Sequence, residues 1–128
     1  PITLASNTTQ LQVLTGSATQ SGVISEQDGA RPLEKIGAGT LTLSGVNTYS
    51  GGTTISAGRL NVASDGNLGA TAGGITLGSA TLGTTATFGS ARGVTLTGAA
   101  TLDVASATAL TLTGAVSGTG SLTKTGLG

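Results

Sequence analysis

Residues 33–60 carry the pattern that decides the fold, and they read LEKIGAGTLTLSGVNTYSGGTTISAGRL. Apolar residues alternate with threonine in short runs, such as Thr40–Leu43 and Thr53–Ile55, which is typical of strands that bury one face. Glycines separate these runs and permit sharp turns. The stretch therefore predicts three strands joined by two turns.

The same stretch resembles the passenger-associated repeat of bacterial autotransporters. The positions that match are Lys35, Gly37, Gly39, Thr40–Gly45, Asn47–Tyr49, Gly51–Ile55, Gly58 and Leu60. A second copy of the motif begins at Ser121, where Leu122, Lys124 and Gly128 stand 89 positions after Leu33, Lys35 and Gly39. The resemblance implies a β-helical passenger that a Gram-negative bacterium displays on its surface or secretes.

The domain organisation follows from the two copies. We expect residues 1–128 to form a single β-helix fragment of a longer passenger domain, with a repeat unit of about 89 residues, the repeat motif at 33–60 and the second copy starting at 121. The chain starts without a methionine and stops inside a motif, which favours a fragment.

The composition excludes several classes of function. The five basic and five acidic residues cancel, whereas nucleic acids and anionic membranes attract clustered positive charge. One phenylalanine, one tyrosine and no tryptophan favour an elongated fold with a thin aliphatic core. The chain has no cysteine and no histidine, which excludes disulfides, thiolate metal sites and a Ser-His-Asp triad. No segment is long and apolar enough to span a bilayer, so we expect the fragment itself not to be membrane-inserted.

Aliphatic residues recur about every 20 positions along the chain. One column is Leu4, Ile24, Leu43, Val62, Leu82, Leu102 and Leu122, and a second is Ile36, Ile55, Ile75 and Val94. No segment has a helical period with caps. We therefore predict an all-β fold, a right-handed parallel β-helix (β-solenoid) with about 20 residues per coil and roughly six coils. The strand register is uncertain by one or two residues.

The residues that carry chemistry are sparse, and we expect no enzyme activity and no catalytic, cofactor-binding or metal site. Glu26 and Asp28 share a loop and are the best candidates for a carboxylate pair, although a solvated loop is the simpler reading. Asp65 is expected in a turn, and Asp103 is expected to form a weak surface pair with Lys124.

Two polar residues of the motif also have a structural reading. We expect Asn47 to satisfy backbone groups in a turn and Tyr49 to pack over the side of a coil.

The most polar segment lies between residues 25 and 35. It holds the residues of a predicted partner-binding loop: Glu26, Asp28, Arg31, Glu34 and Lys35. The leading hypothesis is an elongated stalk or scaffold in an adhesin or virulence factor. Alternatives are a surface that binds a host surface protein or matrix component, and self-association through the open ends of the β-helix.

Overall fold

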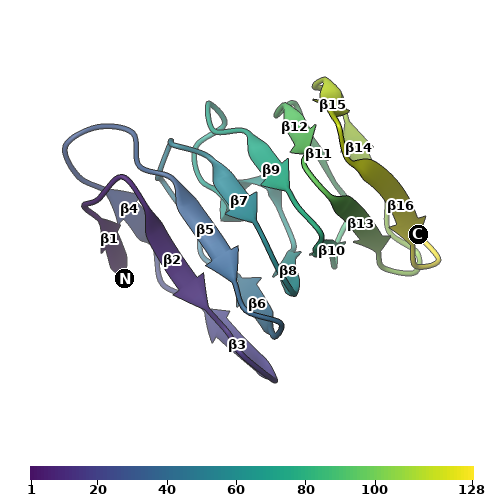
Figure 1. Cartoon of the computed structure of the whole chain (residues 1–128), viewed down its shortest axis with the longest axis horizontal. Coiled ribbons are helices and arrows are strands. Elements are labelled where there is room, and N and C mark those ends of the chain that lie inside the picture. The colour runs from purple at the N-terminus through teal and green to yellow at the C-terminus, as the bar shows by residue number, and fades with distance from the viewer.

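The computed structural model describes all residues 1–128 and contains sixteen strands and one short 3-10 helix. The chain winds as a parallel β-solenoid of about six coils, whose successive coils follow one another along the long axis, with the two termini at opposite ends (Figure 1). The predicted fold class is therefore confirmed. The structure does not bear on the predicted right-handed coiling, which stays a prediction.

Two six-stranded parallel sheets form two faces of the solenoid. Face 1 consists of β2 (Thr9–Gln12), β5 (Leu33–Ile36), β7 (Thr53–Ile55), β9 (Ile75–Leu77), β12 (Val94–Leu96) and β15 (Val116–Gly118). Face 2 consists of β3 (Ser17–Gln20), β6 (Thr40–Leu43), β8 (Arg59–Val62), β10 (Thr81–Thr84), β13 (Ala99–Val104) and β16 (Ser121–Thr125). Within each coil the chain passes from face 1 to face 2.

The third face is interrupted. At one end it holds the pair β1 (Ile2–Leu4) and β4 (Ile24–Glu26), and at the other the pair β11 (Phe88–Ser90) and β14 (Leu110–Leu112). Between the two pairs lie residues 44–52 and 63–74, which contain no strand and include the 3-10 helix η1 (Asp65–Leu68). Face 3 is therefore the face on which the chain departs most from a regular ladder.

The core is a thin column of aliphatic side chains. Alternate residues of each strand point inward, so that Leu41, Leu60 and Leu82 stack on successive coils and are almost fully buried. Each such side chain contributes roughly 1.5–3 kcal/mol when fully buried. One coil encloses too little apolar surface alone, so the coils are stable only as a stack.

The coil length varies more than the sequence predicted. The register advances by 19 residues from Ile75 to Val94 but by 24 from Thr9 to Leu33, and a turn takes about 22 residues on average, not 20. The corner loops, not the strands, absorb this variation. One of these corners is at Pro32, which directly precedes β5 and has no N–H to donate to the ladder.

The predicted columns are correct at some steps and wrong at others. Leu43 pairs with Val62, Leu82 with Leu102 and Ile75 with Val94, as predicted. The step from Ile24 to Leu43 is wrong, because Ile24 is on face 3 and Leu43 on face 2. Four further steps are wrong and instead pair Ile2 with Ile24, Leu82 with Leu60, Leu77 with Ile55 and Lys124 with Leu102. These four errors are shifts of two residues. A shift of two keeps a side chain on the same face of its strand, so hydrophobic pattern cannot detect it.

Candidate interaction surface

The loop between β4 and β5, residues 27–32, carries two of the five predicted partner-binding residues, Asp28 and Arg31. Glu26 stands at its start, where one carboxylate oxygen accepts hydrogen bonds from the backbone N–H groups of Arg31 and Ser50, both at 2.8 Å. The other oxygen accepts from the Ser50 hydroxyl at 2.6 Å. The hydrogen bonds from Ser50, and then that from Arg31, hold the pKa of Glu26 below its ordinary value. Glu26 therefore joins the loop to the next coil.

Arg31 organises the rest of this loop. Its guanidinium group donates to the carbonyls of Gln27 at 3.0 Å and Asp28 at 3.1 Å, and to the side-chain oxygen of Asn7 in the preceding coil. Asp28 adopts a left-handed backbone with φ of 59°. Its side chain is exposed and makes no hydrogen bond, so Asp28 presents a free carboxylate at the surface.

Glu34 lies on the outer side of face 1 rather than in the loop. One carboxylate oxygen accepts from the side chain of Gln10 at 2.7 Å, and the other from the hydroxyl of Ser56. These two bonds, with that from Ser56 the stronger, lower the pKa of Glu34. A shallow hollow of about 250 Å³ lies beside it, lined by Thr8, Thr9, Pro32, Glu34 and Thr54.

Lys35 points into the solenoid and is only 1% exposed. Its ammonium group donates to the carbonyls of Ile36 at 2.8 Å, Gly37 at 2.7 Å and, in the next coil, Ala57 at 3.2 Å. Burial lowers the pKa of Lys35. Lys35 faces Ile55 in the ladder, the position that the sequence pattern assigned to Ile36. The assignment of Ile36 to the core column was thus wrong by one residue.

The structure therefore divides the five predicted residues into three groups. Glu26, Asp28 and Arg31 meet in one loop, Glu34 stands nearby on face 1, and Lys35 is inside. The surface of this region consists of Asp28, Arg31, Glu34 and the threonines around the hollow, and its role in binding a partner stays a prediction.

The predicted pair of Asp103 with Lys124 is wrong, because Asp103 pairs with Arg59 instead. Its carboxylate lies 2.6 Å from the guanidinium group of Arg59, two coils away, and accepts from the hydroxyl of Thr125 at 3.1 Å. The strand between them has Gly83, where an added Cβ would lie 2.4 Å from a nitrogen of Arg59. Glycine therefore leaves the path over which Arg59 reaches Asp103, while Lys124 points toward the core.

The sequence analysis missed a buried ion pair on face 3. Arg92 is 3% exposed and lies 2.8 Å from Asp65, with further hydrogen bonds to the carbonyls of Gly69, Ala70 and Gly73. Burial raises the pKa of Asp65, but the bonds from Arg92 and Ser90 outweigh it and leave the pKa below its ordinary value. Asp65 was interpreted only as a turn residue, because the two residues are 27 positions apart and no local pattern joins them.

Asn47 and Asn67 form a ladder inside the interrupted face. The Asn47 side chain accepts from the N–H of Ile24 at 2.8 Å and donates to the carbonyl of Asn67 at 2.7 Å, so it links three coils. The Asn67 side chain donates to the carbonyl of Gly45 at 3.0 Å. The expectation that Asn47 satisfies backbone groups is confirmed.

We expected Tyr49 to pack over the side of a coil, and the structure places it completely buried in the core. Its hydroxyl group lies 2.7 Å from the hydroxyl of Thr53. Burial raises the pKa of Tyr49 to about 12.

Two further features concern metal binding and membrane insertion. No group of three or more histidine, cysteine, aspartate or glutamate side chains is placed to hold a metal ion. None of the helical segments has the length and hydropathy of a membrane-spanning helix.

Comparison with known proteins assigns the motif. Residues 33–62 match the family described as Passenger-associated-transport-repeat. Residues 33–62 are a passenger-associated transport repeat. The chain is also 44% identical to the adhesin BmaC autotransporter of Brucella suis biovar 1 (strain 1330) over 113 residues, which make up 88% of this chain and 3% of that protein. No solved structure matches the chain.

The resemblance found in the sequence is thus confirmed. The passenger-associated transport repeat and the similarity to an adhesin autotransporter assign the chain to the β-helical passenger of an autotransporter, which is surface-displayed or secreted. The chain spans only a small part of this relative.

Proposed function

We propose that this segment is a stiff, elongated stalk within an adhesin passenger, and that it holds an adhesive region away from the bacterial surface. Its contribution to host-cell adhesion and virulence is then mechanical, with no enzyme activity of its own. The observation that supports this proposal is that most of its carboxylates bond to residues of other coils.

Four of the five carboxylates connect different coils. Glu26 bonds to Ser50, Glu34 to Gln10 and Ser56, Asp65 to Arg92, and Asp103 to Arg59 and Thr125. A carboxylate that is already bonded within the protein is less available to a ligand. Here Asp65 and Asp103 pair with arginines, and Glu26 and Glu34 accept hydrogen bonds from neutral groups along the stack. The arrangement therefore favours cohesion of the solenoid over recognition of a partner.

A replacement experiment tests this proposal. In an adhesin that carries this segment, residues 1–128 are exchanged for an unrelated parallel β-helix with the same number of coils. We expect attachment of the bacteria to host cells to be retained, because only the length is needed. Deletion of the segment, with equal surface display, serves as the length control. Loss of attachment after the exchange, at equal surface display, would contradict the stalk proposal.

The second candidate is direct binding of a host surface protein or matrix component by the loop at residues 27–32. The observation that favours it is the free carboxylate of Asp28 beside Arg31, on a loop outside the coil. The test is binding of the isolated chain to host cells, with Asp28→Asn as the variant and Thr76→Ser on face 1 as the matched control. Binding that Asp28→Asn removes and Thr76→Ser retains supports this candidate, and absence of binding at high concentration rejects it.

A further inference from the structure

The two copies of the motif lie on different faces of the solenoid. Leu33 and Lys35 belong to β5 on face 1, whereas Leu122 and Lys124 belong to β16 on face 2. Four coils bring the chain from Leu33 through Thr53, Ile75 and Val94 to Val116, still on face 1. The repeat of 89 residues continues six residues further, across one corner, to Leu122.

The local structure is the same in both places despite the change of face. Lys124 points toward the core, and its ammonium group donates to the carbonyls of the next two residues, Thr125 and Gly126, as Lys35 does to Ile36 and Gly37. Gly37 and Gly126 both have a positive φ, of 81° and 77°. The motif thus builds the same lysine-bonded corner on whichever face it starts.

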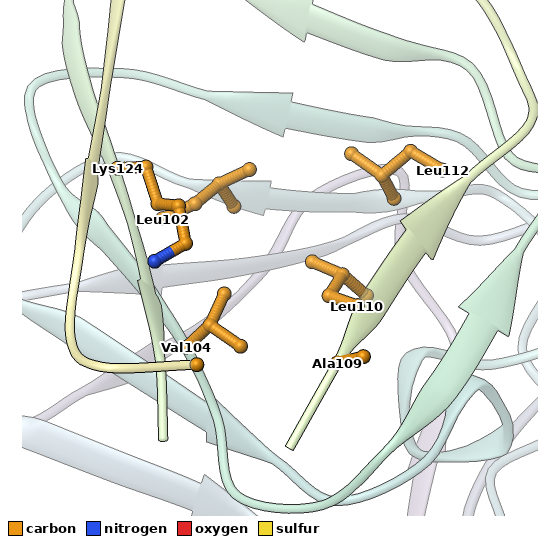
Figure 2. A pocket seen from close by; sticks show the side chains of 7 residues that line it. Leu102, Val104, Ala109, Leu110, Leu112 and Lys124 are labelled. Atoms are coloured by element: carbon orange, nitrogen blue, oxygen red, sulfur yellow. The ribbon is translucent and has the colours of Figure 1, made fainter. Parts of the chain in front are cut away.

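One partner is missing from the second corner. Lys35 donates its third hydrogen bond to the carbonyl of Ala57, in the coil that stacks on β5. Lys124 has no third carbonyl, and it borders a hollow of about 420 Å³ lined by Leu102, Val104, Ala109, Leu110, Leu112 and Gly128. In Figure 2 these side chains face the hollow from two sides, with Leu110 and Leu112 opposite Leu102, Val104 and Lys124.

We propose that this end of the solenoid is a docking surface for a coil with the sequence of residues 40–62, seated one face further round than in the first copy. The counterpart of Thr53–Ile55 then stacks on β16 of face 2, as β7 stacks on β5 of face 1. The counterpart of Ala57 supplies the third carbonyl to Lys124. The interrupted face, with its asparagine ladder, moves to the side of face 1. This inference is independent of the stalk proposal.

Cross-linking of an extended chain tests the seating. A second copy of residues 40–62 is joined after Gly128, and its threonine that corresponds to Thr54 is changed to cysteine. In the first copy Thr54 pairs with Glu34, whose counterpart is Thr123 on face 2. We expect a disulfide with Thr123→Cys in most molecules and only traces with Ser117→Cys on face 1, because adjacent parallel strands lie within disulfide reach. A disulfide with Ser117→Cys, or with neither, overturns the proposal.

A lysine variant gives a second readout that needs no cysteine. We expect Lys124→Met to leave the thermal midpoint of the 128-residue chain unchanged, but to lower that of the extended chain as much as Lys35→Met does. An extension with the residues of 40–62 in scrambled order is the control. Equal effects of Lys124→Met in both chains overturn the proposal, as does end-to-end association of the 128-residue chain that persists after the extension.

Discussion

At the scale of the residue, Lys35 shows how a charge is accepted in a thin aliphatic core. Lys35 stands in the ladder between Leu11 and Ile55, and its ammonium group donates to three backbone carbonyls at a corner. Backbone carbonyls that lose such a donor inside a protein are left unsatisfied, which costs about 1–3 kcal/mol. Lys35 therefore connects two coils through its hydrogen bonds, and its charge is not available to a partner.

This role predicts a large effect of Lys35→Met, which keeps the length and apolar character of the side chain but removes the donor. We expect the free energy of unfolding to fall by about 1–3 kcal/mol. Lys124→Met is the matched control, because Lys124 is exposed, and it is expected to change stability by less than about 0.5 kcal/mol. Urea denaturation followed by tyrosine fluorescence measures both. An equal, small effect of the two variants contradicts the role given to Lys35.

Tyr49 gives a second prediction at this scale, because it is the only tyrosine in the chain. The absorbance of its phenolate reports one group, and we expect a midpoint near pH 12 in the folded protein, against about 10 in urea. Between these values the folded state holds a proton that the unfolded state has lost, so stability falls as the pH rises from 10 toward 12. A midpoint near 10 in the folded protein contradicts the burial of the hydroxyl group.

At the scale of the element, the corners decide how closely two coils approach. Gly16 and Gly58 both stand at corners between face 1 and face 2, with φ of 67° and 66°. An added Cβ at Gly16 meets nothing within 4 Å, whereas at Gly58 it would lie 2.4 Å from the carbonyl oxygens of Gly37 and Gly39. The two glycines therefore share a backbone strain but differ in the space around them.

Alanine at these two positions separates strain from stacking. We expect Gly16→Ala to cost about 1 kcal/mol through the left-handed backbone alone. Gly58→Ala is expected to cost more, because the corner must also move away from the coil below. Thermal unfolding of the two variants measures the difference. Equal losses would mean that the corners do not control coil stacking.

The strands and the fold were predictable from the sequence, but the register was not. Alternation of leucine and threonine, as in Thr40–Leu43, is a local signal that specifies a strand and its inner face. Corner loops of different length shift the register by two residues, which leaves this signal unchanged. The sequence could therefore show that Leu82 is in the core, but not that it stacks on Leu60.

The polar interior was the least predictable part. Lys35 and Arg92 were not expected inside, because a charged side chain in a sequence usually marks a surface position. Both side chains are held inside by hydrogen bonds to backbone carbonyls. These carbonyls belong to corners and to the loop at 65–73, and they come within reach only when the coils are stacked. Asn47 was interpreted correctly because asparagine side chains commonly bond backbone groups near turns.

At the scale of the whole molecule, the inter-coil carboxylates predict how the solenoid responds to acid. The pKa values of Glu26, Glu34, Asp65 and Asp103 lie below their ordinary values of 4.5 for glutamate and 3.8 for aspartate. In this range the unfolded chain binds more protons than the folded one, so stability falls as the pH falls.

We therefore expect the urea midpoint to be constant from about pH 7 to about pH 5 and to fall steeply below about pH 4.5. Glu34→Gln keeps the shape of the side chain but does not titrate, and it is expected to make the fall shallower. Asp28→Asn is the control, since the side chain of Asp28 makes no hydrogen bond. A midpoint that does not change between pH 5 and pH 3 would show that the carboxylates do not hold the coils together.

The placement of Leu33 on face 1 and Leu122 on face 2 has an evolutionary consequence. If the predicted unit of about 89 residues repeats, each added unit lengthens the protein by about 21 Å, at about 4.8 Å for each coil, and starts the next motif on the next of the three faces. The length of the protein and the direction of its far end would thus change together. Under this prediction, only a gain of three units returns the motif to the same face, and a gain of one or two units points whatever follows in another direction.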